Sequence, residues 1–243
     1  MNNNETDTSW TPLRLAAVPV LVVLFDLWKT IARGPYPEPI KLLKELLNLE
    51  EVSDDEFLVV CLTTPFEDPE RYLMHISEYF GMGEIPDGAL EDFRSLIQNE
   101  KNGLLLFTDV VAELTLIKEQ GYRLGLVTNS WPFPVYDLLR TTGLDQIFEH
   151  VISSHEVGIA KQDGPEIYRL AAQRFGVEPE QCLMVGDNPA LDVLPAHDAR
   201  VKAVLIDRDG TYVDREGKFK DVRFQDLQVT VVRNLNELSS RLR

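Results

Sequence analysis

The stretch Val20–Ala32 reads VLVVLFDLWKTIA, a run of apolar residues that ends at Asp26. The apolar run, which begins at Leu15, is too short to cross a bilayer and lacks the flanking residues of a signal peptide. It therefore predicts a buried strand of a parallel sheet. Functional groups in such sheets gather where the strands end, so Asp26 becomes a candidate functional residue.

Apolar segments like this one recur along the chain and alternate with helical patterns. The segment 109–121, DVVAELTLIKEQG, predicts a helix that ends at Gly121. This alternation predicts an α/β fold, with a Rossmann-like parallel sheet core covered by helices on both faces. The other expected strands are YRLGLVTN (122–129), HVIS (150–153), CLMVGD (182–187) and KAVLID (202–207).

The pattern changes between residues 34 and 103, where no strand is expected. Four segments there have the spacing of amphipathic helices, with Pro, Asp or Ser at their starts. We expect an inserted all-helical cap domain at 34–103, a core domain at 13–33 and 104–243, and a disordered leader at 1–12. The helical segments are PEPIKLLKELLNLE (37–50), SDDEFLVVCL (53–62), DPERYLMHISEYFG (68–81) and PDGALEDFRSLIQNEK (86–101).

Composition restricts the class of partner. The 243 residues carry a formal net charge of −16, which disfavours binding to nucleic acid or to an anionic membrane. The two cysteines, Cys61 and Cys182, have no metal-ligand spacing and are expected to be reduced. We therefore expect a cytoplasmic protein whose partner is a small molecule. The sequence does not indicate an oligomeric state.

Two aspartate loops compete for the role of nucleophile. The segment Ala203–Val213, AVLIDRDGTYV, contains Asp207 and Asp209 followed by Gly-Thr, which is a phosphoryl-transfer signature. The loop after Asp26 has a similar frame, but its second acidic position is Trp28.

Four signals along the chain decide between the two loops. Asp26 and Thr30 follow the first strand, Thr128 and Asn129 lie in GLVTNS, Lys161 lies in VGIAKQDGPEIY, and Gly186, Asp187 and Asp192 lie in VGDNPALD. In this order and spacing, the set resembles the haloacid dehalogenase-like hydrolase superfamily from Leu15 to about Asp214. Use of Asp207 as nucleophile would require a permuted motif order. We therefore interpret Asp26 as the nucleophile, and Asp207, Asp209 and Gly210 as a surface turn.

The resemblance implies roles for the remaining residues and a Mg²⁺ cofactor. Asp26 would attack phosphorus and form an acyl-phosphate. Mg²⁺, which prefers oxygen ligands, would be held by Asp26, Asp187 and the backbone carbonyl of Trp28, with Asp192 nearby. The Thr128 hydroxyl and the Lys161 ammonium would bind the phosphoryl oxygens, and Asn129 and Arg33 are also expected to contact the substrate. Tyr36 and Arg71 are further candidates for substrate contact.

Trp28 departs from the family's phosphatases, in which an acidic residue at this position protonates the leaving group. An indole offers only an N–H and cannot replace that acid. Lys29 also replaces the usual glycine. Three interpretations follow: a phosphohydrolase that manages without this acid or borrows one, with His75 as a conceivable donor; a 2-haloacid dehalogenase, whose halide leaves without a proton; or a non-enzymatic relative that binds phosphate or a partner. The intact GDNPALD segment favours the phosphohydrolase.

Overall fold

The strand that ends at Asp26 lies at the centre of a six-stranded sheet. The computed structural model describes residues 18–242 except 37, 66–67 and 213–221, so the predicted leader at 1–12 lies outside the described residues. The strand order is β10-β7-β6-β1-β4-β5, and every neighbouring pair is parallel. The strands are β1 (Val22–Phe25), β4 (Arg123–Thr128), β5 (His150–Ser153), β6 (Cys182–Gly186), β7 (Lys202–Ile206) and β10 (Thr230–Val232).

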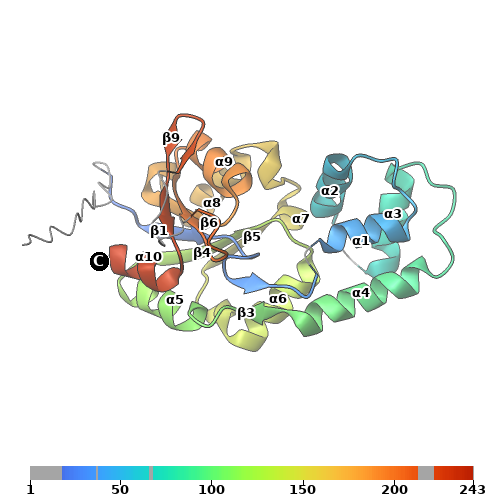
Figure 1. Cartoon of the computed structure of the whole chain (residues 1–243), viewed down its shortest axis with the longest axis horizontal. Helices are drawn as coiled ribbons and strands as arrows, with labels where there is room; N and C mark the ends of the chain where they lie inside the picture. Colours follow the sequence, from blue (N-terminus) through green and yellow to red (C-terminus); the bar gives the residue numbers. More distant parts are fainter. Residues whose placement is uncertain (1–17, 37, 66–67, 213–221, 243) are drawn as a thin grey trace, which may run out of the picture.

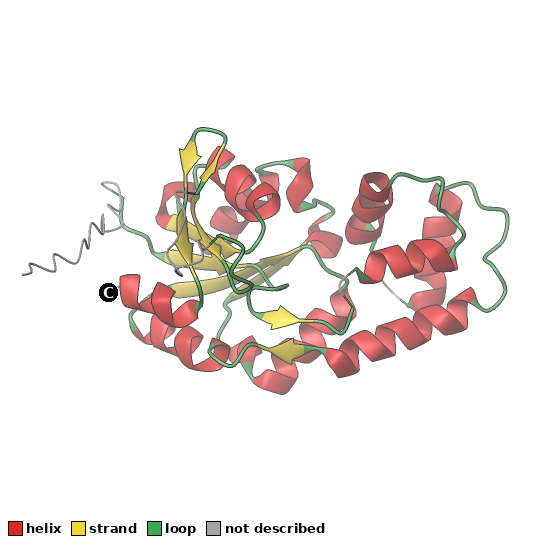
Figure 2. Ribbon diagram, in the orientation of Figure 1, coloured by secondary structure: helices red, strands yellow, loops and turns green. Residues whose placement is uncertain are grey.

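Helices cover both faces of this sheet (Figures 1 and 2). Alternate residues of β1 point to opposite faces, because side chains alternate along a strand. Val23 and Phe25 pack in the cluster formed with α5, α6 and α10, whereas Val22 and Leu24 pack in the cluster formed with α8 and α9. The covering helices are α5 (Val110–Glu119), α6 (Pro132–Thr142), α8 (Glu166–Phe175), α9 (Leu194–Asp198) and α10 (Leu235–Arg241). The predicted α/β core is thus confirmed.

The sequence patterns missed the shorter elements. The edge strand β10 has three residues and pairs in parallel with β7. The strands β8 (Arg223–Phe224) and β9 (Leu227–Gln228) form an antiparallel pair. Runs of two or three residues are too short to show a period of two, which is why they carry no recognisable signal. The helix α7 (Ser154–Val157) has only four residues and was missed for the same reason.

The insertion after β1 is helical, as expected, and forms a separate lobe at the right of Figure 1. Its helices are α1 (Pro39–Leu46), α2 (Asp54–Thr63), α3 (Pro69–Tyr79) and α4 (Ala89–Gly103). Ser53 and Asp68 cap the first turns of α2 and α3 through side-chain oxygens that accept backbone N–H groups. The four helices enclose their own apolar cluster, which includes Phe57, Leu73 and Phe93. The boundaries at 34 and 103 stay a prediction.

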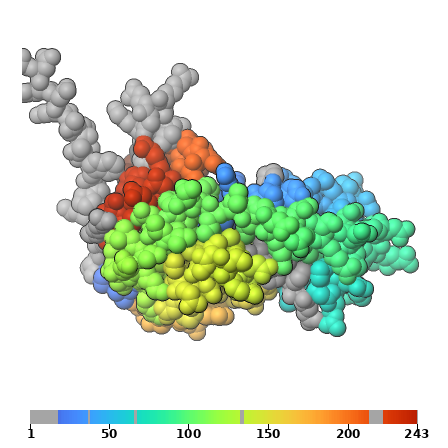
Figure 3. Space-filling view, turned by 90° about the horizontal axis from the view of Figure 1, so that it is seen from below, coloured from blue at the N-terminus to red at the C-terminus, as the bar shows by residue number. Residues whose placement is uncertain are grey.

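Several contacts among the described residues join the helical lobe to the core. The strands β2 (Ala32–Arg33) and β3 (Leu105–Leu106) form an antiparallel pair where the chain leaves and re-enters the core. Trp131, from the loop after β4, is buried in the apolar cluster of the helical lobe, and its indole Nε1–H donates to the Tyr72 hydroxyl at 2.9 Å. Lys101 on α4 lies 2.8 Å from Asp137 on α6. In Figure 3, α4 and α5 accordingly run as a continuous green strip from the lobe to the core.

Candidate active site

The predicted site residues meet where the central strands end. Asp26 directly follows β1, Thr128 is the last residue of β4, and Asp187 directly follows β6. Since β4 and β6 are the two neighbours of β1, the three residues share one edge of the sheet. From β1 the chain continues outward through β4 and β5 on one side, then crosses back to β6 and continues outward through β7 and β10 on the other side. Asp26 therefore lies at a topological switch point, where α/β sheets bind their ligands.

A buried lysine holds two of the carboxylates. The Lys161 ammonium lies 2.5 Å from the Asp26 carboxylate and 2.6 Å from the Asp192 carboxylate, and all three side chains are almost fully buried. Pairing of this kind offsets part of the cost of burying the three charges. Sequence analysis predicted a role at the phosphoryl group for Lys161, and the structure adds this direct pairing with Asp26.

Asp192 is positioned by the turn that follows β6. The Asn188 side chain caps that turn by accepting the N–H groups of Ala190 and Leu191. The Asn188 N–H donates to the second oxygen of Asp192 at 3.0 Å. Asp192 thus has one oxygen on Lys161 and the other on the backbone, which fixes the orientation of its carboxylate.

Gly186 leaves the space that this carboxylate needs. A Cβ at position 186 would lie 2.2 Å from the Asp192 Cγ, which is far closer than two carbon atoms approach. We expect Gly186→Ala to lower the free energy of unfolding by about 1–3 kcal/mol, because the buried carboxylate must move. Chemical denaturation would measure this loss. Gly83→Ala is the matched control, since a Cβ there meets no atom within 4 Å; equal losses from both changes would contradict the prediction.

The three aspartates form a dense acidic group. Ligand atoms of Asp26, Asp187 and Asp192 all lie within 4.8 Å of one another. Burial, together with the Asp192 and Asp187 carboxylates, raises the pKa of Asp26 to about 8, although Lys161 acts in the opposite direction. Burial and the neighbouring Asp192 raise the pKa of Asp187 to about 6. One lysine is therefore too little positive charge for three carboxylates, and the group has the composition of a site for a divalent cation.

The loop after β4 provides polar groups next to this acidic group. Thr128 is fully buried, and its Oγ1 has no hydrogen-bond partner among the described residues. Asn129 accepts the backbone N–H of Lys161 at 3.0 Å and donates to the Gln162 side chain at 2.6 Å. Asn129 therefore links this loop to the Lys161 loop. An unpaired buried hydroxyl is costly unless a ligand supplies the partner.

The second aspartate loop has a structural role. Both oxygens of Asp207 accept backbone N–H groups, from Thr211 and Tyr212, each at 2.8 Å. The prediction of a surface turn is correct for Asp209 and Gly210, which are exposed, but wrong for the Asp207 side chain, which is buried. The carboxylate can be buried because these two N–H groups replace the hydrogen bonds that water would otherwise form with it.

Arg208, in the same turn, connects it to the loop that follows Asp26. The guanidinium donates to the Thr30 carbonyl at 2.8 Å and to the Asp109 carboxylate at 3.1 Å. It also lies over the Phe107 ring, 4.0 Å from the ring centroid. The turn that contains Asp207 and Asp209 therefore helps to hold the loop that follows Asp26.

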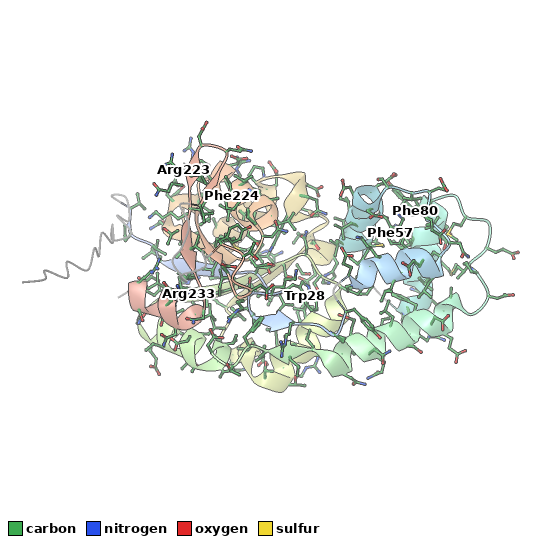
Figure 4. All side chains as sticks on the ribbon, in the orientation of Figure 1. Trp28, Phe57, Phe80, Arg223, Phe224 and Arg233 are labelled. Atoms are coloured by element: carbon green, nitrogen blue, oxygen red, sulfur yellow. The ribbon has the colours of Figure 1, made fainter. Side chains whose placement is uncertain are left out.

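Trp28 and Lys29 follow Asp26 in the chain and line a pocket of the structure. Lys29 has a φ of 55°, the left-handed conformation that glycine adopts most easily, which accounts for the glycine usual at this position. Trp28 is half-buried, packs against the main core cluster and lies on the side of the core that faces the helical lobe (Figure 4). Both residues line a pocket of about 590 Å³ between core and lobe.

Some of the candidate substrate-contact residues line this pocket and others do not. Arg33 and Tyr36 line it, together with Asn129 from the acidic edge of the sheet. His75 and Arg71 do not line it; both are exposed on α3. The suggestion that His75 could donate a proton is therefore not favoured by its position.

Comparison with known proteins identifies the family of the chain. The family of haloacid dehalogenase-like hydrolases matches the chain over residues 20–200, and a second description, HAD-like hydrolase, matches residues 163–238. The first match covers well over half of the chain and includes every candidate site residue. The chain belongs to the haloacid dehalogenase-like hydrolase family.

Among curated relatives of this hydrolase, a phosphoserine phosphatase from Thermus thermophilus is 39% identical over 144 residues, which are 58% of this chain and 57% of the relative. A glyceraldehyde 3-phosphate phosphatase from Methanothermobacter thermautotrophicus is 28% identical over 206 residues, which are 84% of this chain and 82% of the relative. The hydrolase thus spans little more than half the length of the first relative, but most of the second.

Solved structures share the fold. A HAD phosphatase from Thermococcus onnurineus has a TM-score of 0.59 at 24% identity and covers 92% of this chain and 98% of that chain. A 2-haloacid dehalogenase from Pseudomonas syringae pv. Tomato has a TM-score of 0.61 at 22% identity with the same coverage. Because a phosphatase and a dehalogenase match equally well, the fold does not choose between the two chemistries.

One residue that lines the pocket was missed by sequence reasoning. Glu100 is 1% exposed, although it lies in a segment, QNEK, that reads as the polar end of an amphipathic helix. No local signal distinguishes it from a surface glutamate, since its burial depends on contact with residues around position 34.

None of the helices in the described ranges is long and apolar enough to cross a membrane.

Proposed function

We propose that this hydrolase is a Mg²⁺-dependent phosphohydrolase that acts on a small phosphorylated metabolite through an aspartyl-phosphate on Asp26. The observation that carries the proposal is the acidic group of Asp26, Asp187 and Asp192 beside the unpaired, buried Thr128 hydroxyl. A dehalogenase needs no such group of carboxylates, because its substrate lacks the phosphate dianion. The names of the curated relatives, which are phosphatases, support the same choice.

The residues present fit the cofactor. Mg²⁺ takes carboxylate and carbonyl oxygens as ligands. Asp26 and Asp187 would hold it together with the backbone carbonyl of Trp28, and Asp192 would lie next to it. The cation would neutralise charge on the phosphoryl oxygens, which a group of carboxylates would otherwise repel.

The reaction has two steps on Asp26. In the first, an Asp26 oxygen bonds to phosphorus, the bond from phosphorus to the ester oxygen breaks, and the leaving alkoxide takes up a proton from water. In the second, water attacks phosphorus, the bond to Asp26 breaks, and phosphate leaves. The Thr128 hydroxyl and the Lys161 ammonium would contact the phosphoryl oxygens, where charge gathers in the transition state. Asn129 and Arg33 would contact the substrate from the pocket.

A substrate screen tests this proposal. The panel contains phosphoserine, glyceraldehyde 3-phosphate, p-nitrophenyl phosphate and 2-chloropropionate, each with and without Mg²⁺. We expect release of phosphate that depends on Mg²⁺ and no release of chloride. Chloride release that is indifferent to Mg²⁺ would establish the dehalogenase instead, and the absence of both products would leave a non-enzymatic binding protein.

Mg²⁺ should also stabilise the folded chain. A ligand that binds only the folded state, at a concentration about 100 times its Kd, adds about 2.7 kcal/mol, or about 5–10 °C in a chain of this size. We expect a thermal melt to show this rise, and Asp187→Ala to abolish it. Asp209→Ala is the control, because Asp209 is exposed and lies outside the acidic group. A melting temperature that does not change with Mg²⁺ concentration would contradict the assignment of the cation site.

A further inference from the structure

Glu100 is a buried carboxylate that the proposed reaction does not use. It lies on α4, in the helical lobe, and is 1% exposed. The Tyr36 backbone N–H donates a hydrogen bond to the carboxylate. Its Oε1 has no hydrogen-bond partner among the described residues.

This carboxylate lies on the wall of a pocket that Trp28, Asn129 and Leu191 also line, and these three residues are close in the chain to Asp26, Thr128 and Asp192. Glu100, Trp28 and Gly34 all line that pocket. A Cβ on Gly34 would lie 3.2 Å from the Glu100 Oε2 and 3.2 Å from the Trp28 Cζ3, so the carboxylate and the indole both lie next to Gly34. A substrate with its phosphoryl group at Asp26 would therefore have its remaining part in this pocket, next to Glu100.

A carboxylate buried in this way lacks a compensating charge. Within the described part of the chain, no lysine, arginine or histidine forms an ion pair with Glu100. Burial raises the pKa of Glu100 to about 7, and the hydrogen bond from Tyr36 only partly offsets this rise. A leucine or methionine would fill the same position without that cost, so stability does not account for an acidic residue here.

We propose that Glu100 binds an ammonium group on the leaving portion of the substrate, so that the preferred substrates are phosphate monoesters of amino alcohols. An ammonium would supply the missing hydrogen bond to Oε1 and would also neutralise the buried charge, whereas a hydroxyl would supply only the first. This assignment rests on the proposed phosphohydrolase function and specifies which phosphate esters that site accepts.

A matched pair of substrates tests the assignment. O-Phosphoethanolamine and 2-hydroxyethyl phosphate differ only in the amine that replaces a hydroxyl. For the Mg²⁺-loaded wild-type protein we expect kcat/KM to be about 10–100-fold higher for the amine, the range expected of a hydrogen bond to a charged group. Glu100→Gln keeps the size and the bond to Tyr36 but removes the charge, and should bring the two substrates within a few-fold of each other.

Glu91→Gln is the matched control, because Glu91 lies on the same helix and is exposed. It should leave the wild-type preference for the amine unchanged. A wild-type protein without that preference, or a preference that survives Glu100→Gln in a folded protein, would overturn the assignment.

Failure of the assignment can be told apart from failure of the proposed function. p-Nitrophenyl phosphate has no amine, so its hydrolysis reports the phosphohydrolase site alone, and Glu91→Gln should hydrolyse it within a few-fold of the wild-type rate. If no phosphate ester is turned over, the proposed function fails. In that case, the melting temperature with Mg²⁺ and each member of the pair still tests the role of Glu100. A rise that is specific to the amine and is lost in Glu100→Gln would support the assignment. Equal rises with both compounds, or no rise, would overturn it.

Discussion

Asp26→Asn should lower turnover at least about 10⁴-fold, the scale seen when a covalent nucleophile is removed. An amide is a poor nucleophile, and it carries no charge for the Lys161 ammonium to pair with at 2.5 Å. Phosphate release from p-nitrophenyl phosphate with Mg²⁺ would measure the loss. The variant should still fold, because Asn and Asp have nearly the same shape.

Asp207→Asn makes the same chemical change in the other aspartate loop. Asp207 uses both oxygens to accept N–H groups from Thr211 and Tyr212, and an amide keeps only one acceptor. We expect a stability loss of about 1–3 kcal/mol but turnover within a few-fold of wild type, measured well below the melting temperature. Equal losses of turnover from the two changes would refute the assignment of Asp26 as nucleophile.

Trp28→Asp should raise turnover of alkyl phosphates by up to about 10²-fold. The new carboxyl could protonate the leaving oxygen and then activate water, work that is typically worth about 10²–10⁴ in rate. We expect less than the full range, because the surrounding residues are not arranged to hold an acid there. The nearby Glu100 would favour the protonated form of the new carboxyl, since like charges raise each other's pKa.

Two comparisons isolate the proton from other effects of this change. Trp28→Asn has the same shape as Trp28→Asp but no acid, so it should show no gain. An aryl phosphate leaves readily without a proton, so p-nitrophenyl phosphate should gain less than an alkyl phosphate.

Loss of the indole could also unfold the chain, since Trp28 packs against the core cluster. Circular dichroism and melting curves must therefore accompany the kinetics. A folded Trp28→Asp protein that binds Mg²⁺ yet shows no gain on any alkyl phosphate would mean that the position does not limit turnover.

Much of the fold was predictable from local sequence. The continuous apolar runs that end at Phe25, Thr128 and Gly186 marked parallel strands, because a strand covered on both faces must be apolar throughout. The helices of the insertion were predictable from their spacing and from caps such as Ser53 and Asp68. The three-residue strand β10 was not, since so short a run has no measurable period.

The candidate site was predictable only in part. Motif order ranked Asp26 above Asp207, and the parallel sheet implied that strand-end residues such as Thr128 and Asp187 would lie together. The ion pairs of Lys161 were not predictable, because Asp26 and Lys161 are 135 positions apart and their 2.5 Å contact depends on the loops. The buried Asp207 carboxylate was missed for a related reason, since its two N–H donors come from the fold of a turn.

The sequence by itself therefore determined the α/β class, the helical insertion and the identity of the strand-end residues, because each follows from a periodicity or an order along the chain. The tertiary structure decided which charges meet. In it, Lys161 pairs with both Asp26 and Asp192, and Trp131 is buried in the apolar cluster of the helical lobe. One carboxylate oxygen of Glu100 has no hydrogen-bond partner among the described residues. Whether a charged side chain is solvated, paired or left for a ligand depends on residues that approach it from distant parts of the chain, and no local pattern records that approach.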